Sequence, residues 1–366
     1  MAYALFDRYP RTASLPLAGI ATLPTPIDWP EAQWFEDEPI GPVYVKSDDL
    51  TSPAYGGNKV RKLDLLLGDA LAKGAKSVLT FGAYGSNHAL ATAVHARALG
   101  LEPHVVLSPQ EPGPYAPATL LAHAGLRTVL HLTDGWDGKR AAVVAMRELE
   151  VRDGVGPYVI PMGGTNDLGA VGYVNAALEV ADQIAHPIAA LVPPDVVYCA
   201  AGTLGTAIGL AVGFAAAGMH ARVEAIRVTP LEVASEDTAR ELTASTVALL
   251  QRLDSSFPLL GYDDLAFTLR HDCFEPGYGI VTPETEEAVV LAEQTGLRLE
   301  TTYTGKAFSA MLGDARTGRL HPDEHVLFWD TYSSAAMPAA GPVEALPEAL
   351  RDYVAECERQ FGTAVR

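Results

Sequence analysis

From about Lys46 onward, short runs of β-branched and aromatic residues alternate with longer segments rich in alanine and leucine. The clearest runs are SVLTFG, HVVLS, TVLHL, YVIPMGG, DVVYCAAG, VEAIRVT and HVLFWDT. Continuous apolar runs of this length are typical of buried strands, whereas the segments between them suit helices. The alternation predicts an α/β fold with largely parallel sheets. Because there are more strands than one small sheet needs, we expect two lobes with a cleft between them.

One long apolar segment also has the length of a membrane-spanning helix. Residues Val196 to Met219, VVYCAAGTLGTAIGLAVGFAAAGM, run for 24 residues without a charged side chain, which is enough to cross a bilayer. The segment nevertheless starts with β-branched residues and contains five glycines. We interpret it as a buried strand, a Gly/Thr turn and a small-residue helix packed on a sheet.

Composition narrows the classes of partner. The 366 residues are 48% apolar, enough for a sizeable core, and the formal net charge is −19. No basic block interrupts the acidic background, so we expect neither nucleic acid nor an anionic membrane as a partner. The cysteines, Cys199, Cys273 and Cys357, are odd in number and far apart, which does not suit a disulfide framework. Because MAYALFDRYPRT has no signal-peptide pattern, we expect a cytoplasmic protein.

The segment SPAYGGNKVRKLDLLLGDALAKG, Ser52 to Gly74, carries an unusual cluster of positive charge. Two glycines precede the expected first turn of an amphipathic helix, and Lys59, Arg61 and Lys62 lie in that turn. A helix N-terminus already carries roughly half a positive charge, so three cations there are unfavourable without an anion. For any one of them alone, a solvated surface residue paired with a nearby aspartate is the simpler interpretation.

Three turns that follow predicted strands present short polar side chains at a helix start. Their residues are Ser86, Asn87 and His88 in the first, Thr165 and Asn166 in the second, and Gly202, Thr203, Gly205 and Thr206 in the third. Such turns hold phosphate or carboxylate at the ends of parallel strands, although each alone is more simply an ordinary cap. None matches a Walker loop or a dinucleotide fingerprint. The histidine pairs 88/95 and 321/325 lack a metal-binding pattern, so we expect no metal.

Lys59, in the cationic turn formed by residues 59–62, favours a ligand-binding site over these simpler interpretations. A lysine among other cations at the positive end of a helix is more easily deprotonated, and its neutral amine can attack an aldehyde. An aldehyde that also carries a phosphate would satisfy Arg61 or Lys62 together with the third turn. Pyridoxal 5′-phosphate is such a molecule, and we predict it as the cofactor.

The same segments resemble those of a known family. From about Val45 to Thr331 the chain is similar to fold type II pyridoxal-phosphate enzymes, in the branch that contains D-cysteine desulfhydrase and 1-aminocyclopropane-1-carboxylate (ACC) deaminase. The motifs, in order, are GGNKVRKLDLLL, GAYGSNHALATAVHARALGL, IPMGGTNDLGAVGY, AGTLGTAIGL, PGYGIVTPE and YTGKAF. The resemblance implies two lobes, each an open, mostly parallel, twisted sheet flanked by helices, with the cofactor in the cleft. It assigns residues 1–60 and 180–366 to a larger cofactor-binding domain and residues 61–179 to a smaller one.

The resemblance also implies roles for individual residues. Lys59 would bond the cofactor and would serve catalysis together with Ser86, Tyr278 and Tyr303. The other residues expected to bind the cofactor are Lys62, Asn87, Gly202, Thr203, Leu204, Gly205, Thr206 and Thr331. The residues expected to bind the substrate are Ser86, Asn87, His88, Thr165 and Tyr303.

Some positions match one branch of the family and others depart from it. His88 and Thr304 are as in the desulfhydrases, which favours elimination from a D-amino acid. The segment ALAT after Ser-Asn-His, Leu204 in place of glycine, and DTYSS at 330–334 are departures. We expect a lyase or deaminase that removes the Cα proton and the β-substituent of a small amino acid, giving a 2-oxo acid and ammonia. The alternatives are ACC ring opening, racemisation, β-substitution, or an α/β ligand-binding protein without catalysis.

Two neighbouring residues compete for the pyridine nitrogen of the cofactor. Alternation along a strand sends Asp330 and Thr331 to opposite faces, so only one of them can point inward. The resemblance favours Thr331. It also implies that the protein is a homodimer.

Overall fold

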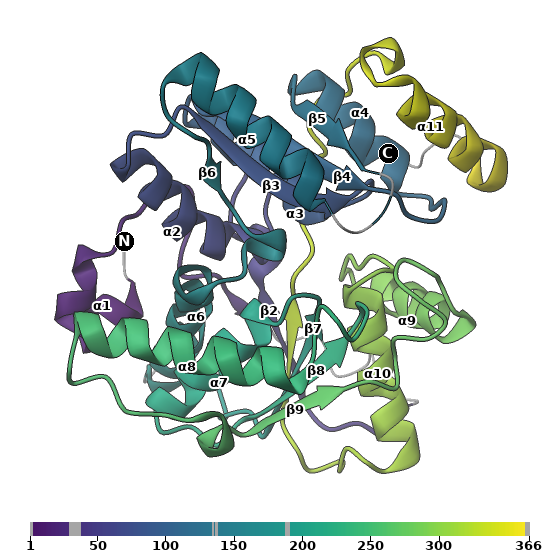
Figure 1. Cartoon of the computed structure of the whole chain (residues 1–366). Coiled ribbons are helices and arrows are strands. Elements are labelled where there is room, and N and C mark those ends of the chain that lie inside the picture. The colour runs from purple at the N-terminus through teal and green to yellow at the C-terminus, as the bar shows by residue number, and fades with distance from the viewer. Residues whose placement is uncertain (1–2, 29–37, 134, 136–137, 187–190, 363–366) are drawn as a thin grey trace.

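The computed structural model describes residues 3–28, 38–133, 135, 138–186 and 191–362. Their strands form two sheets, which lie one above the other in Figure 1. The larger sheet has the order β1, β2, β10, β7, β8, β9, with bounds Ile27–Asp28, Val43–Ser47, Val326–Asp330, Val196–Ala201, Arg222–Arg227 and Phe267–Arg270. The smaller sheet has the order β5, β4, β3, β6, with bounds Val129–Leu132, Glu102–Ser108, Ser77–Ala83 and Tyr158–Val159.

Neighbouring strands run parallel in both sheets, except that β1 is antiparallel to β2. Each apolar run in the sequence forms a strand, and the predicted α/β fold with mainly parallel sheets is confirmed. Strands β1, β2 and β9 were not among the predicted runs. β1 has two residues, Lys46 interrupts the apolar pattern of β2, and β9 is a four-residue strand that ends in Arg270.

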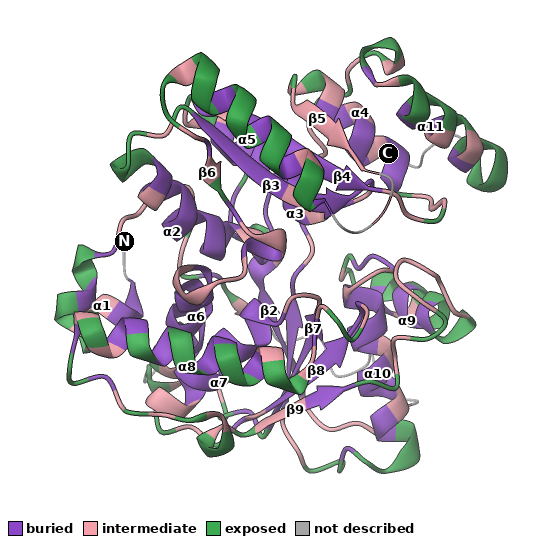
Figure 2. Cartoon of the chain, viewed as in Figure 1, coloured by how far each residue is buried: buried purple, intermediate pink, exposed green. Residues whose placement is uncertain are grey.

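Helices cover the sheets, and Figure 2 shows the strands buried between helices whose outer faces are exposed. The helices are α1 (Ala4–Arg8), α2 (Lys59–Ala72), α3 (Asn87–Ala98), α4 (Ala116–Gly125), α5 (Lys139–Asp153), α6 (Asp167–Ala185), α7 (Gly205–Ala216), α8 (Glu236–Leu253), α9 (Pro283–Gln294), α10 (Thr304–Thr317) and α11 (Glu348–Phe361).

Val197 and Cys199 of β7 join the core formed with α6, α7 and α8. Val196 and Tyr198 join the core formed with α9 and α10. The alternation places these two cores on opposite faces of the larger sheet.

Helix α6 packs closely against both α2 and α7 because glycines remove side chains at the contacts. A Cβ on Gly172 of α6 would lie 2.3 Å from the backbone oxygen of Arg61 in α2. A Cβ on Gly209 of α7 would lie 2.4 Å from the Cβ of Tyr173, the next residue of α6. Gly209 and Gly213 of segment 196–219 therefore serve helix packing, and the segment divides into strand, turn and helix as predicted. Across the described parts of the chain, no helix has both the length and the apolar character of a membrane span.

The C-terminal helix α11 packs on α4, and Figure 1 shows the two helices side by side. They are far apart in the sequence. Leu350 and Val354 of α11 share a buried cluster with Leu120 of α4 and with Val105 and Leu107 of β4. Residues 348–361 therefore lie with the smaller sheet, although the division predicted from the sequence put them in the larger domain. The domain boundaries themselves stay a prediction.

Candidate active site

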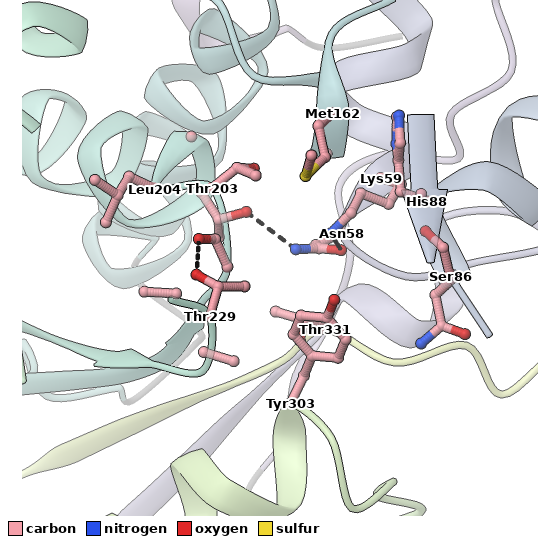
Figure 3. A pocket seen from close by; sticks show the side chains of 18 of the residues that line it. Asn58, Lys59, Ser86, His88, Met162, Thr203, Leu204, Thr229, Tyr303 and Thr331 are labelled. Atoms are coloured by element: carbon pink, nitrogen blue, oxygen red, sulfur yellow. Dashed lines mark hydrogen bonds between the residues drawn. The ribbon is translucent and has the colours of Figure 1, made fainter. Parts of the chain in front are cut away.

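A pocket opens at the carboxyl ends of β3, β7 and β10 and is bordered by both sheets. It encloses about 840 Å³, part of which is open to solvent. The starts of α2, α3 and α7 complete its wall, so polar segments far apart in the sequence meet there (Figure 3). Open parallel sheets bind ligands at this edge.

Most of the residues predicted for the site line this one pocket. They are Lys59, Lys62, Ser86, Asn87, His88, Gly202, Thr203, Leu204, Gly205, Thr206, Tyr278, Tyr303 and Thr331. Thr165 is not among the described lining residues. Lining residues that sequence reasoning missed are Asn58, Met162, Thr229, Val233, Glu300 and Tyr332. Asn58 stands beside Lys59 in the GGNK motif, and Glu300 stands shortly before YTGKAF, so position next to a motif was the available signal.

Lys59 is the first residue of α2, and its amine lies inside the pocket. Its Nζ donates a hydrogen bond of 2.8 Å to Oδ1 of Asn58, and Nδ2 of Asn58 donates one of 3.0 Å to Oγ1 of Thr206. The same Nζ lies 5.9 Å from the ring centroid of Tyr303. Burial lowers the pKa of Lys59 to about 8, against a smaller opposing effect of Glu300. Roughly a tenth of this amine is therefore neutral at pH 7, far more than for a lysine with the ordinary pKa of 10.5, and the neutral form is the one that a nucleophile or a base requires.

The other two cations of this turn have different partners. Arg61 points away from the pocket, is fully buried, and forms ion pairs of 2.8 Å with Asp48 and 2.9 Å with Glu179. The expectation that Arg61 could meet a phosphate is wrong, because its anions are these two carboxylates. Lys62 lines the pocket, and its Nζ lies 3.2 Å from the backbone oxygen of Gly163 and 3.2 Å from Oγ1 of Thr165.

The turn between β7 and α7 forms a cradle for an anion. Leu204 is the N-cap of α7, adopts a left-handed φ of 65°, and places no side-chain acceptor on the first amides of the helix. A Cβ on Gly205 would lie 2.6 Å from Oγ1 of Thr165 and 2.8 Å from Nζ of Lys62. Without that Cβ, uncapped amides, two threonine hydroxyls and a lysine amine converge. This donor set fits the phosphate group of pyridoxal phosphate.

Thr165 lies behind this cradle. Its Oγ1 is 2.7 Å from Oγ1 of Thr203 and also accepts from Lys62. The neighbouring Asn166 is the N-cap of α6, where its Oδ1 accepts a hydrogen bond of 2.8 Å from the amide of Gly169. The interpretation of Asn166 as a cap therefore holds, and Thr165 contacts the cradle.

The turn between β3 and α3 and the start of that helix present Ser86, Asn87 and His88 to the pocket. Figure 3 shows Ser86 and His88 there. Ser86 is a true N-cap, because its Oγ accepts from the amide of Ala89 at 3.2 Å. Nε2 of His88 lies 2.8 Å from Oγ1 of Thr80, and its buried Nδ1 has no hydrogen-bond partner in the described part of the chain. Burial and the charges of Lys59 and Lys62 hold the pKa of His88 well below its usual value, so the imidazole is neutral.

Two tyrosines and a carboxylate complete the wall near Lys59. The hydroxyls of Tyr278 and Tyr303 lie 2.8 Å apart, and burial raises the pKa of Tyr278 to about 12. The buried carboxylate of Glu300 accepts hydrogen bonds from the backbone amides of Thr302, Tyr303 and Thr304 at 2.8, 2.7 and 3.0 Å. Glu300 thereby fixes the loop that carries Tyr303. Both tyrosines are protonated at neutral pH and can donate hydrogen bonds.

At the end of β10, the two residues that could face the pyridine nitrogen of the cofactor have different surroundings. Thr331 lines the pocket. Asp330 is buried, is not among the described lining residues, and accepts a hydrogen bond of 3.1 Å from the amide of Tyr332. Burial and the neighbouring Asp49 raise the pKa of Asp330 well above its usual value, so its neutral form is favoured.

The sequence profile of the pyridoxal-phosphate dependent enzymes matches residues 21–331 of this chain. The chain belongs to that family. Pyridoxal phosphate is its cofactor, as the cationic turn and the resemblance predicted. The match covers the cationic turn, the strand-end turns and the end of β10 in one continuous stretch.

Individual members of the pyridoxal-phosphate family are also similar over nearly the whole chain. D-cysteine desulfhydrase of Salmonella paratyphi A is 34% identical over 342 residues, which cover 92% of this chain and 97% of the relative. A crystal structure of an ACC deaminase homologue is 30% identical with a TM-score of 0.75, covering 98% of this chain and 100% of the other. Threonine deaminase isoform 2 of Solanum lycopersicum, 15% identical with a TM-score of 0.57 over 98% of this chain and 90% of its own, shares the fold.

Proposed function

We propose that this pyridoxal-phosphate enzyme is a lyase of the D-cysteine desulfhydrase type. It removes the Cα proton and the β-substituent of a small amino acid and releases a 2-oxo acid and ammonia. The observation that carries the proposal is the placement of Lys59 in a pocket with a hydroxyl pair, Tyr278 and Tyr303, on one side and an anion cradle on the other. Similarity to D-cysteine desulfhydrases over 92% of the chain supports it.

The cofactor would be held by residues of the cradle and of α2. The first amides of α7, with Thr203, Thr206 and Lys62, would bind its phosphate, and Lys59 would hold its aldehyde carbon. When bound, pyridoxal phosphate supplies an electron sink that stabilises negative charge at the substrate Cα. The neutral hydroxyl of Thr331 would meet the pyridine nitrogen, which suits prompt elimination better than a carboxylate there.

The residues of this chain then have distinct tasks in the reaction. Ser86 and Asn87, at the positive end of α3, bind the substrate carboxylate. The amine of Lys59, with a pKa lowered to about 8 and oriented by Asn58, takes the Cα proton and holds it at Nζ. The paired hydroxyls of Tyr278 and Tyr303 donate a hydrogen bond to the β-substituent as it leaves with its electron pair.

The direct test is a panel of β-substituted alanines, supplied as separate D and L enantiomers, with ACC included. We expect 2-oxo acid and ammonia in equal amounts from at least one β-substituted D-amino acid. Release of 2-oxobutanoate from ACC alone would instead assign ring opening. Interconversion of enantiomers without 2-oxo acid would assign a racemase.

We also propose that the enzyme is a homodimer, as the family resemblance implies, and that it acts in the cytoplasm, whose reducing conditions suit its three free cysteines. Light scattering of the purified holoenzyme checks the first part, because a dimer has twice the mass of the 38.8 kDa chain. A single-chain mass at micromolar concentration would contradict it.

A further inference from the structure

A second cavity adjoins the active-site pocket. The two share Asn87, Glu300, Tyr303 and Tyr332 in their walls. The second cavity encloses about 610 Å³, part of it open to solvent, and continues past these residues toward the start of α4. A substrate bound through its carboxylate at Asn87 therefore has space on this side for a longer side chain.

The second cavity carries one cation among its described lining residues, Arg298. The guanidinium carbon of Arg298 lies 5.8 Å from the ring centroid of Tyr332, which also borders the active-site pocket. No ion pair of Arg298 occurs among the described residues. Glu300 lines the same cavity, and its carboxylate is held by the backbone amides of the loop rather than by an ion pair with Arg298.

The polar groups around Arg298 suit an anion. Thr119 of α4, Thr302 and Asn87 line the same cavity, so hydroxyl and amide donors share it with the guanidinium. The chain as a whole carries a net charge of −19, which repels anionic substrates. A cation at this position lowers that repulsion at one place, beside the catalytic pocket.

We propose that this cavity is a subsite for the distal end of the substrate and that Arg298 selects amino acids whose β-substituent carries a negative charge. The inference rests on the proposed function, because it extends the same site. Arg298 would then determine specificity without contacting the reacting atoms.

Two esters test the inference under matched chemistry. O-acetylserine and O-succinylserine both lose a carboxylate from Cβ, and each yields a 2-oxo acid, ammonia and the free acid. They differ in the distal carboxylate of the succinyl group. In the holoenzyme we expect kcat/KM for O-succinylserine to exceed that for O-acetylserine. Because Arg298 is exposed, Arg298→Gln should lower kcat/KM for O-succinylserine by about fivefold, through KM, and leave O-acetylserine unchanged.

Two further variants control for charge and folding. Arg147→Gln, on the exposed face of α5, makes the same change in net charge far from this cavity and should leave both esters unchanged. Arg298→Lys keeps the charge and should retain most of the preference. An equal effect of Arg298→Gln on both esters, or the same effect in Arg147→Gln, overturns the assignment.

A binding measurement separates this inference from the proposed function. Glutamate and glutamine have nearly the same shape and differ in the distal charge. By calorimetry, the holoenzyme should bind glutamate more tightly than glutamine, and Arg298→Gln should remove the difference. If neither ester is turned over while this difference holds, the proposed function fails and the anionic subsite stands. If the esters react but glutamate has no advantage, the subsite fails alone.

Discussion

At the scale of single residues, the amine of Lys59 offers the most direct test of the site. In Lys59→Ala, borohydride should no longer attach pyridoxal phosphate to the chain, and the melting temperature should change little. Mass spectrometry of the wild-type protein should place the reduced label on the peptide that carries Lys59. The nearby pocket lysine Lys62 is the control, and a label on Lys62 would show that the wrong lysine had been assigned.

The lowered pKa of Lys59 also sets a pH dependence. An amine with a pKa of about 8 is neutral over a wider range than one at the ordinary 10.5. In protein freed of cofactor, the rate of pyridoxal phosphate attachment should rise about tenfold per pH unit below 8 and level off above it. Stopped-flow absorbance measures that rate. A rate that still climbs at pH 10 would indicate an unperturbed lysine.

Ser86 has two tasks, capping α3 and binding substrate, and a second serine separates them. Ser235 caps α8 with the same geometry, accepting from the amide of Thr238 at 3.2 Å, outside the lining of the pocket. Loss of either cap costs about 1 kcal/mol. Ser86→Ala and Ser235→Ala should therefore lower the melting temperature similarly, while only the first lowers turnover, by orders of magnitude. Similar turnover in the two variants would leave Ser86 as a cap alone.

Asp330 and Thr331 are distinguished by the spectrum of the bound cofactor. Thr331→Val should shift the absorbance of the holoenzyme and change the elimination rate, because a hydroxyl at the pyridine nitrogen is lost. Asp330→Asn should leave both unchanged, since Asp330 is not among the described residues that line the pocket. The reverse pattern would show that Asp330 controls the electronics of the ring.

At the scale of elements, helix α2 is anchored beneath the pocket by buried charges. Arg61 pairs with Asp48 and Glu179, and Glu179 also pairs with Lys46 at 2.6 Å. Removal of one partner leaves an unpaired buried charge, so Arg61→Met should lower the free energy of unfolding by about 3–5 kcal/mol. Arg240→Gln, which breaks an exposed pair with Asp263, should cost far less because solvent already screens that pair. Urea unfolding of both variants compares them, and equal losses would contradict the anchoring role.

The same buried charges determine how the stability of the fold changes in acid. Burial alone would raise the pKa of Glu179, but Arg61 and Lys46 outweigh it and lower the pKa to about 2. A carboxylate with a lowered pKa stabilises the fold above its ordinary value of 4.5, and this contribution is lost as the pH falls toward 2. Glu179→Gln should therefore flatten the dependence of stability on pH in that range.

The elements differ in how far the sequence predicts them. Strands such as β7, buried at every position, are continuous apolar runs and were predicted directly. Strand β2 was missed because Lys46, the fourth of its five residues, interrupts the apolar run, and a buried lysine is acceptable there only with Glu179, which is 133 residues away in sequence. Arg61 was misplaced for the same reason, since its partners are fixed by folding. Glu300 and Arg298 became visible only when the loop before α10 met the pocket.

At the scale of the whole molecule, the cofactor connects segments that belong to both sheets. The cradle follows β7 of the larger sheet, whereas Ser86 to His88 follow β3 of the smaller one. Removal of pyridoxal phosphate should lower the melting temperature, because a ligand that binds only the folded state stabilises it by mass action. Hydrogen exchange should become faster in the first turns of α2 and α7. Unchanged exchange in both turns would show that the cofactor contacts neither.

The glycine contacts of α6 have a mechanical consequence. Gly172 and Tyr173 are consecutive, yet the first abuts the backbone of α2 and the second abuts Gly209 of α7. The helix that begins with Lys59 and the helix that begins at the cradle are thus clamped to one turn of a third. Because α2 also shares a buried cluster with β3 and α3, this clamp ties the smaller sheet to α7 of the larger one. The end of α2 that carries Lys59 and the anion cradle at the start of α7 are therefore held at a set spacing, as a cofactor bound at both places would require.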